Sequence, residues 1–184
     1  MNIILLRKQD FISNTNTVLI RDYRLTHITK VLNPCVGQSL KVGLVGEKCG
    51  HGLVESIDPH VVKLRVFLDK SPPRRHQFDI ILALPRPKML RRILRTIAEY
   101  GVSNLHLINS ARVEKSYWQS PLLKKEKIQE ALIAGMERSK DPLMTSVHLH
   151  QRFRPFIEDQ LGNICGTRKC WITDMRATQS AVEL

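Results

Sequence analysis

The sequence predicts an α+β protein of two parts, in which a small β-barrel is followed by an incomplete α/β layer with a parallel sheet. Apolar residues alternate along short segments up to residue 70, whereas from residue 77 they recur at helical spacing. The stretch DKSPPRRH, with two prolines, separates the two patterns. Beyond it, a strand, an amphipathic helix and a strand follow within about 30 residues, as in a βαβ unit. We expect domains at residues 1–70 and 77–184, joined by a linker at residues 71–76.

Short strands account for most of the first part. The last of them alternates most clearly, because Val62, Leu64, Val66 and Leu68 fall on one side. Glycine-containing turns between such strands favour a small barrel. We expect one or two helical turns at residues 25–32, and strands at residues 2–6, 17–20, 40–45, 52–57 and 62–68.

The second part begins with the βαβ unit. Pro87 suits the first turn of its helix and Gly101 suits the C-terminal cap. We expect strands at residues 80–84, 104–108, 146–150 and 170–173, and helices at residues 88–100, 121–138 and 153–161. Open α/β sheets bind ligands at the carboxyl ends of their strands. The loops after the first two strands are therefore the candidate site, and they carry four cations, Arg86, Lys88, Arg112 and Lys115.

Charge points to the kind of partner. The formal net charge is +12, and the excess is spread along the chain: residues 1–76 carry 12 Lys and Arg against 6 Asp and Glu, and residues 77–184 carry 17 against 11. Two basic, folded parts favour nucleic acid as the partner. The alternative is an ordinary solvated basic face, above all for the predicted helix face with Lys88, Arg91, Arg92 and Arg95.

Several other classes of site lack support in the sequence. The four cysteines show no C-x-x-C spacing, so we expect reduced thiols and no metal site. His148 and His150 could pair on a metal, but an exposed strand edge is the favoured interpretation. Tyr117 and Trp118 could stack on a base, although core packing is commoner. No phosphate-binding loop, signal peptide or membrane-spanning run occurs, so we expect a cytoplasmic protein without membrane contact.

Two long segments resemble one known family. RLTHITKVLNPCVGQSLKVGL is similar to the N-terminal PUA-like domain of the RsmE family, and LALPRPKMLRRILRTIAEYGVSNLHLINSARVEKSYWQSPLL to the start of its methyltransferase domain. The match runs in order from residue 1 to about residue 173. The resemblance implies a PUA-like RNA-binding barrel followed by a SPOUT-type α/β domain. It also implies S-adenosylmethionine as cofactor, methylation of N3 of a uridine in 16S ribosomal RNA, the small ribosomal subunit as partner, and a homodimer.

Together with the charge pattern, the resemblance leads us to expect RNA contacts from Arg24, His27, Lys30, Arg86, Lys88, Arg112 and Lys115. The family places its methyl-donor site in a C-terminal trefoil knot with a G-P-E-G-G loop and an L-G-x-R-I-L-R-x-E-T segment, and neither occurs in these 184 residues. We therefore expect a chain that lacks the knot, as a truncated product or a fragment, and we assign no catalytic or cofactor-binding residue. The alternative is a non-catalytic RNA- or ribosome-binding remnant; a small-molecule α/β enzyme has weaker support, because no nucleophile constellation is present.

Overall fold

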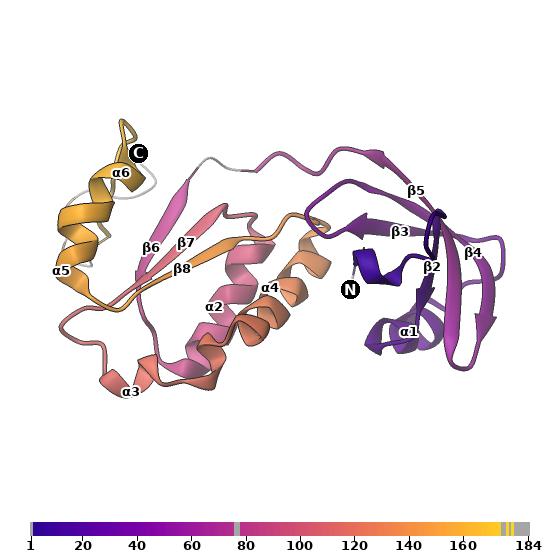
Figure 1. The fold of residues 1–184 in the computed structure, drawn as a ribbon, viewed down its shortest axis with the longest axis horizontal. Helices are drawn as coiled ribbons and strands as arrows, with labels where there is room; N and C mark the ends of the chain where they lie inside the picture. Colours follow the sequence, from indigo (N-terminus) through magenta and orange to yellow (C-terminus); the bar gives the residue numbers. More distant parts are fainter. Residues whose placement is uncertain (1, 76–77, 174–175, 177, 179–184) are drawn as a thin grey trace.

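The computed structural model describes residues 2–75, 78–173, 176 and 178. Two sheets organise this part of the chain (Figure 1). The first has the strand order β1-β3-β4-β5-β2 and the second β6-β7-β8. The strands are β1 (Ile4–Leu6), β2 (Thr17–Ile20), β3 (Ser39–Leu44), β4 (Cys49–Asp58), β5 (Val61–Lys70), β6 (Asp79–Ala83), β7 (Asn104–Ile108) and β8 (Ser146–His150).

Helices and helical turns connect the strands. The α-helices are α1 (Tyr23–His27), α2 (Pro87–Glu99), α3 (Lys115–Trp118), α4 (Lys125–Ser139), α5 (Phe153–Pro155) and α6 (Leu161–Cys165). The helical turns of other types are η1 (Lys8–Asp10), η2 (Ile28–Leu32), η3 (Pro121–Leu123) and η4 (Phe156–Gln160). No helix of the described residues is long and apolar enough to cross a membrane.

The first sheet is curled and mostly antiparallel, since only β1 and β3 run parallel. Its core forms as the alternation predicts, because Val62, Leu64 and Val66 of β5 are buried together with Val42 of β3 and Val54 of β4. The β-rich character of this part is confirmed. The edge strands β1 and β2 do not pair with each other, so the closed PUA-like barrel stays a prediction.

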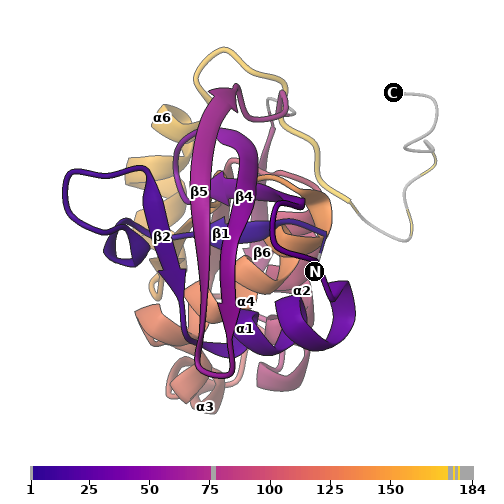
Figure 2. The same cartoon turned by 90° about the vertical axis from the view of Figure 1, so that its right-hand side faces the viewer.

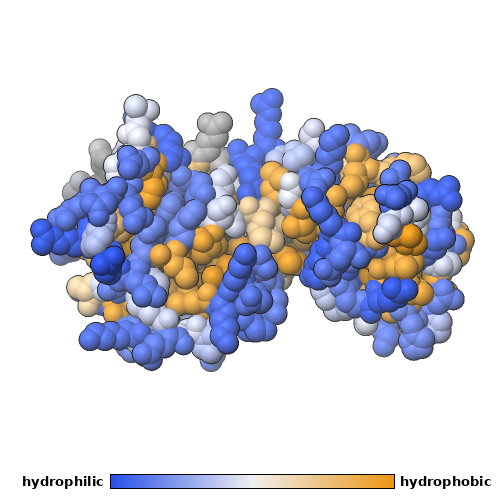
Figure 3. Space-filling model, viewed as in Figure 1, coloured by the Kyte–Doolittle hydropathy of each residue, from blue (hydrophilic) through white to orange (hydrophobic). Residues whose placement is uncertain are grey.

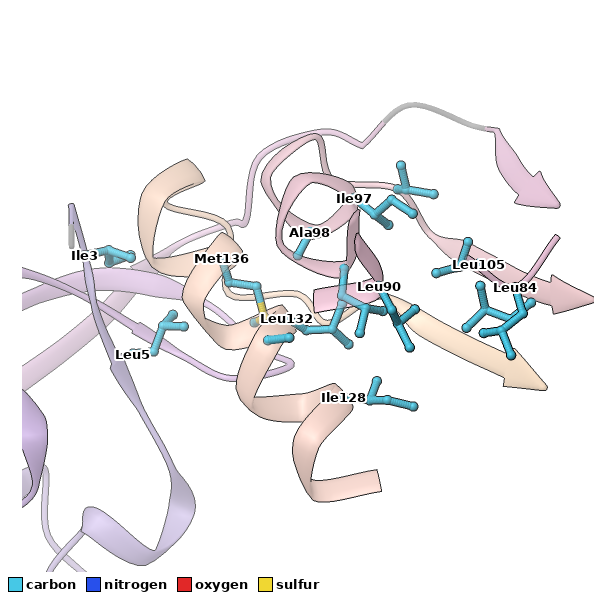
Figure 4. Close-up of a cluster of buried hydrophobic side chains, with 14 residues drawn as sticks. Ile3, Leu5, Leu84, Leu90, Ile97, Ala98, Leu105, Ile128, Leu132 and Met136 are labelled. Atoms are coloured by element: carbon cyan, nitrogen blue, oxygen red, sulfur yellow. The ribbon is translucent and has the colours of Figure 1, made fainter. Parts of the chain in front are cut away.

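The second sheet is parallel throughout, as predicted from the βαβ pattern. Helices α2 and α4 cover one of its faces, and the segment α5–η4–α6 covers the other (Figure 1). The core under α2 and α4 is drawn in Figure 4, and it includes Leu90 of α2, Leu132 of α4 and Leu105 of β7. The two helices approach closely at Gly135, because a Cβ there would lie 2.2 Å from the backbone oxygen of Arg95.

Strand β1 joins the two parts by packing against both. Ile4 and Leu6 belong to the core of the first sheet, whereas Ile3 and Leu5 pack with the core of the second (Figure 4). The backbone N–H of Asn2 also donates to the backbone oxygen of Glu137 in α4, at 2.7 Å. The opposite faces of one short strand therefore serve two hydrophobic cores.

The connection between the sheets differs from the solvated linker that its charges suggest. The guanidinium of Arg75 is only 12% exposed and pairs with Asp141 at 2.8 Å. It also donates to the backbone oxygens of Val102, Leu143 and Met144. An arginine in a linker is ordinarily solvated, but Arg75 is not, because a carboxylate 66 residues away supplies a buried partner.

Two other expectations need correction. The strand expected at residues 170–173 is absent: these residues are exposed, and no described strand pairs with them. The helix expected from residue 121 begins at Lys125, because Ser120 caps a short 3-10 turn, η3, by accepting a hydrogen bond from the Leu122 N–H. Most of the tail from Asp174 lies outside the described residues.

Candidate nucleic-acid interface

The loops that follow β6 and β7 meet at the carboxyl edge of the parallel sheet. Arg86 precedes α2 in the first loop, and its Nε donates to the hydroxyl of Tyr117 at 3.2 Å. Tyr117 lies in α3, beyond the second loop, and its hydroxyl donates to Glu114 at 2.9 Å. The loop with Arg86 and the segment with Lys115 therefore lie against each other, and Arg86 is held in place by a hydrogen-bonded neighbour.

Aromatic packing fixes the second loop. The indole N–H of Trp118 donates to the side-chain oxygen of Asn109, at 3.1 Å, and the backbone N–H of Asn109 donates to the backbone oxygen of His150. Trp118 and Tyr117 both pack against the hydrophobic core under α2 and α4. These contacts leave Arg112 and Lys115 exposed on the loop and α3, and they support core packing over base stacking for the two aromatic side chains.

A group of exposed cations lies on the loop after β7, along α2, in α3 and at the start of α4, and none has an ion-pair partner among the described residues. We call it the unpaired cation set: Lys88, Arg91, Arg92, Arg95, Arg112, Lys115, Lys124 and Lys125. By contrast, carboxylates lie against Arg75, Lys127, Arg138, Arg154 and Arg168. Figure 3 shows hydrophilic side chains along the lower rim, where α3 lies in Figure 1. Uncompensated positive charge at one edge of a sheet suits a polyanion.

Arg24 does not belong to this surface, and the expectation that it contacts RNA is corrected. Its side chain is 2% exposed, and it donates to Asp10 at 2.7 and 2.9 Å and to Asp22 at 2.8 Å. A further bond reaches the backbone oxygen of Leu5. Burial lowers the pKa of Arg24, but the hydrogen bonds to the two carboxylates outweigh it, so the pKa lies above its ordinary value. Arg24 therefore fixes β1 to α1.

His27 and Lys30 occupy different surroundings. His27 is half-buried, and its Nε2 is buried with no hydrogen-bond partner in the described structure. Nearby, the hydroxyl of Tyr23 donates to Glu137 of α4 at 2.8 Å, and burial raises the pKa of Glu137. His27 thus lies at the junction between the two parts of the chain. Lys30 is exposed, so it is the predicted contact of the first part that remains accessible.

A histidine cluster covers the other face of the parallel sheet. His148 and His150 share a face, as the sequence suggested, and parallel pairing places His106 opposite His148. The ring centroids of His106 and His148 lie 4.6 Å apart, and Nδ1 of His106 lies 3.1 Å from Nε2 of His150. Desolvation, followed by the neighbouring histidines, lowers the pKa of His106 and of His150. The described residues contain no group of three or more His, Cys, Asp or Glu arranged to hold a metal ion.

Of the three rings in this cluster, His106 was missed by sequence reasoning. Alternation along β7 placed it opposite the buried Leu105 and Leu107, but its partners lie 42 and 44 residues further along the chain. The order of the strands was needed to bring the three rings together.

Known proteins resemble this chain over most of its length. Residues 72–182 match a family model described as RNA methyltransferase domain. The ribosomal RNA small subunit methyltransferase E of Treponema pallidum is 30% identical over 79% of this chain and 56% of its own length. Methyltransferase E 1 of Borreliella burgdorferi is 24% identical over 76% of this chain and 58% of its own length. The chain therefore spans less than two thirds of both relatives.

A solved structure shows the same fold. The ribosomal RNA small subunit methyltransferase E from Neisseria gonorrhoeae, solved with S-adenosyl methionine bound, superposes with a TM-score of 0.66. The sequence identity is 15%, and the match covers 87% of this chain and 65% of that structure.

Proposed function

Because this chain belongs to the ribosomal RNA small subunit methyltransferase E family, we propose that it takes part in methylating N3 of a uridine in the RNA of the small ribosomal subunit. S-adenosylmethionine is the methyl donor in this proposal. The chain's own contribution is to hold the RNA and to position the base. Residues 1–70 act as a PUA-like RNA-binding domain, residues 71–76 as the linker, and residues 77–184 as part of a SPOUT-type domain.

The observation that carries the proposal is the unpaired cation set, which extends from the carboxyl edge of the parallel sheet along α2. Its members have no carboxylate to neutralise them within the described part of the chain, so phosphates can take that place and release counterions. Arg86 stands beside the set, oriented by Tyr117. A guanidinium with a fixed orientation suits bidentate contact with phosphate.

The chemistry proposed here needs this grip. N3 of uridine lies inside the stack, and extruding a base costs a few kcal/mol, which phosphate contacts can offset. Once the imide proton leaves, negative charge develops on the base, and a cation in a fixed position stabilises that charge. Arg86 suits this role better than the flexible Lys88, since Arg86 already has a hydrogen-bonded position.

The residues present do not by themselves furnish a site for the methyl donor. The three loops at the carboxyl edge begin after Ala83, Ile108 and His150, and none of the three contains a glycine before its next helix. Close approach of backbone N–H groups to a cofactor generally depends on glycine. These loops could form one wall of such a site, so we derive no transfer step from them.

The same observation supports a second candidate function, in which the chain binds ribosomal RNA or the small subunit without catalysing methylation. Both candidates bind RNA through the same cations. They differ in whether a complete site for the methyl donor forms. A homodimer, which the family resemblance implies, could complete the site from a second copy.

Binding of small-subunit ribosomal RNA fragments at increasing salt tests the grip. The affinity should fall steeply with salt, and a Lys88→Ser, Arg112→Ser double variant should lower the slope of log Kd against log salt by roughly two, about one for each lost phosphate contact. Arg154→Ser is the control, because Arg154 lies on α5 and already pairs with Glu158. An unchanged slope in the double variant would overturn the proposal. Methyl incorporation into small-subunit particles then separates the two candidates.

A further inference from the structure

Three adjacent strands of the first sheet place Lys41, His51 and Phe67 side by side. Lys41 lies opposite His51 in the β3–β4 pair, and His51 lies opposite Phe67 in the β4–β5 pair. All three side chains are exposed, whereas the neighbouring Val42 and Val66 are buried. The row therefore lies on the face of the first sheet that is turned away from that sheet's own core. Figure 2 shows β4 and β5 in front of the rest of the molecule.

The two aromatic rings in this row are stacked. The ring centroids of His51 and Phe67 lie 5.0 Å apart, with an angle of 18° between the planes. A β-bulge between Cys49 and His51 accompanies this arrangement. Gly50 is required there, because a Cβ would lie 1.8 Å from the backbone oxygen of Phe67. Bulges commonly redirect the side chains that follow them, and here the result is a flat aromatic surface in contact with solvent.

A hollow opens beside Phe67 on the side away from His51. Strand β2 begins at Thr17, opposite Arg65, so its pairing with β5 stops before Phe67. The hollow has a volume of about 360 Å³ and is lined by Phe11, Asn16, Val66, Phe67, Leu68 and Asp69. Its size falls within the range of roughly 300–1,000 Å³ found for small-ligand pockets. Phe67 thus stacks on His51 and also lines the hollow.

The charges around the row suit an anionic chain. Lys41 and Lys70 have no ion-pair partner in the described part of the molecule, and Lys70 lies opposite Cys49 in the same β4–β5 pair. Lys63 and Arg65, further along β5, share the carboxylate of Glu55 at 3.0 and 2.6 Å. The free cations therefore flank the aromatic pair, while the more distant ones are neutralised.

We propose that this outer face binds a single-stranded segment of RNA, with one unpaired base stacked on Phe67 in the hollow and with Lys41 and Lys70 on the adjoining phosphates. Proteins that bind single strands combine aromatic stacking with a basic groove, and several do so on the face of a β-sheet. Asn16 and Asp69 offer hydrogen-bond donors and acceptors to the edge of the base. This inference rests on the proposed function for the kind of nucleic acid and adds a second contact to it.

The test compares single-stranded with double-stranded RNA on the full chain. The probes are a fluorescein-labelled RNA of about ten nucleotides, within the site sizes known for such proteins, and the same strand annealed to its complement. Phe67→Leu keeps an apolar side chain but removes the ring. It should weaken single-strand binding about tenfold and leave duplex binding unchanged. Phe153→Leu is the matched control, because Phe153 is 47% exposed and Phe67 43%.

A second variant keeps the test decisive if Phe67→Leu fails to fold. Phe67→Trp retains a ring, so it should bind the single strand as the unsubstituted chain does, and stacking of a base should quench the added indole fluorescence. Two results would overturn the stacking site alone, provided that the unsubstituted chain binds RNA. One is unchanged single-strand affinity in a folded Phe67→Leu variant, and the other is the absence of quenching in Phe67→Trp. Failure of the unsubstituted chain to bind any RNA would overturn the proposed function as well.

Discussion

The guanidinium of Arg24 and the carboxylate of Asp10 form two hydrogen bonds, at 2.7 and 2.9 Å, in the interior beneath β1. Removing one member of a buried ion pair leaves the other charge without compensation, which costs about 3–5 kcal/mol. Arg24→Ala should therefore lower the free energy of unfolding by that amount in urea denaturation. The affinity of the folded fraction for RNA should stay the same. A loss of RNA affinity without a loss of stability would show that Arg24 contacts RNA after all.

Close contact between α2 and α4 predicts the effect of a methyl group at Gly135. A Cβ there would lie 2.2 Å from the backbone oxygen of Arg95, so Gly135→Ala should force the helices apart and destabilise the chain by about 1–3 kcal/mol. Gly162→Ala is the control, since nothing lies within 4 Å of its added Cβ and a helical alanine is tolerated. Thermal unfolding of both variants checks this, and equal melting temperatures would contradict it.

The histidine cluster predicts a dependence of stability on pH. The pKa of His106 and of His150 is lowered in the folded chain by desolvation and by neighbouring histidines. Asp79 acts in the opposite direction on His106, Arg168 acts in the same direction, and a side-chain hydrogen bond between His150 and Gln160 raises the pKa of His150. As the pH falls, the unfolded chain therefore binds more protons than the folded chain does.

The contribution of neutral His106 and His150 to the free energy of unfolding is complete above the ordinary histidine pKa of about 6.5. The free energy of unfolding should therefore fall as the pH drops below that value. A His106→Asn, His150→Asn double variant should flatten the pH profile of the unfolding free energy between roughly pH 7 and 5. His60→Asn, at an exposed turn, should leave the profile unchanged. A double variant as pH-sensitive as the parent chain would refute this prediction.

The glycine-free loops at the carboxyl edge predict how the 184-residue chain responds to S-adenosylmethionine. Without backbone groups that can approach the cofactor closely, calorimetry should detect no saturable binding at micromolar cofactor. RNA binding by the same preparation is the control for folding. Micromolar affinity would mean that residues outside these loops hold the cofactor.

Much of the fold could be predicted from the sequence because the signals are local. The strands β2, β7 and β8 have the predicted bounds, and the helix α2 differs from its prediction by one residue at each end. Alternation and helical spacing are set by neighbouring residues, which the sequence displays directly. The expected strand at residues 170–173 did not form, since a strand also needs a partner with a free edge, and that partner is not a local property.

The site was less predictable, because its contacts join residues that lie far apart in the sequence. An arginine is usually solvated, so Arg24 was expected at the surface, and nothing in the sequence indicated that Arg75 is buried. Their partners Asp10 and Asp141 lie 14 and 66 residues away in sequence, and no local pattern links them. Likewise, the stacked pair of His51 and Phe67 depends on the pairing of β4 with β5 and on the bulge at Gly50.

The two-sided packing of β1 has a consequence for the order in which the chain matures on the ribosome. Ile3 and Leu5 are among the first residues to be made, yet the α4 surface that covers them extends to Ser139. Domains generally fold as they are synthesised, from the N-terminus. One face of β1 therefore stays exposed to solvent until α4 has left the ribosome. A ribosome paused between Lys70 and Lys125 therefore carries a nascent chain with an apolar strand open to chaperones.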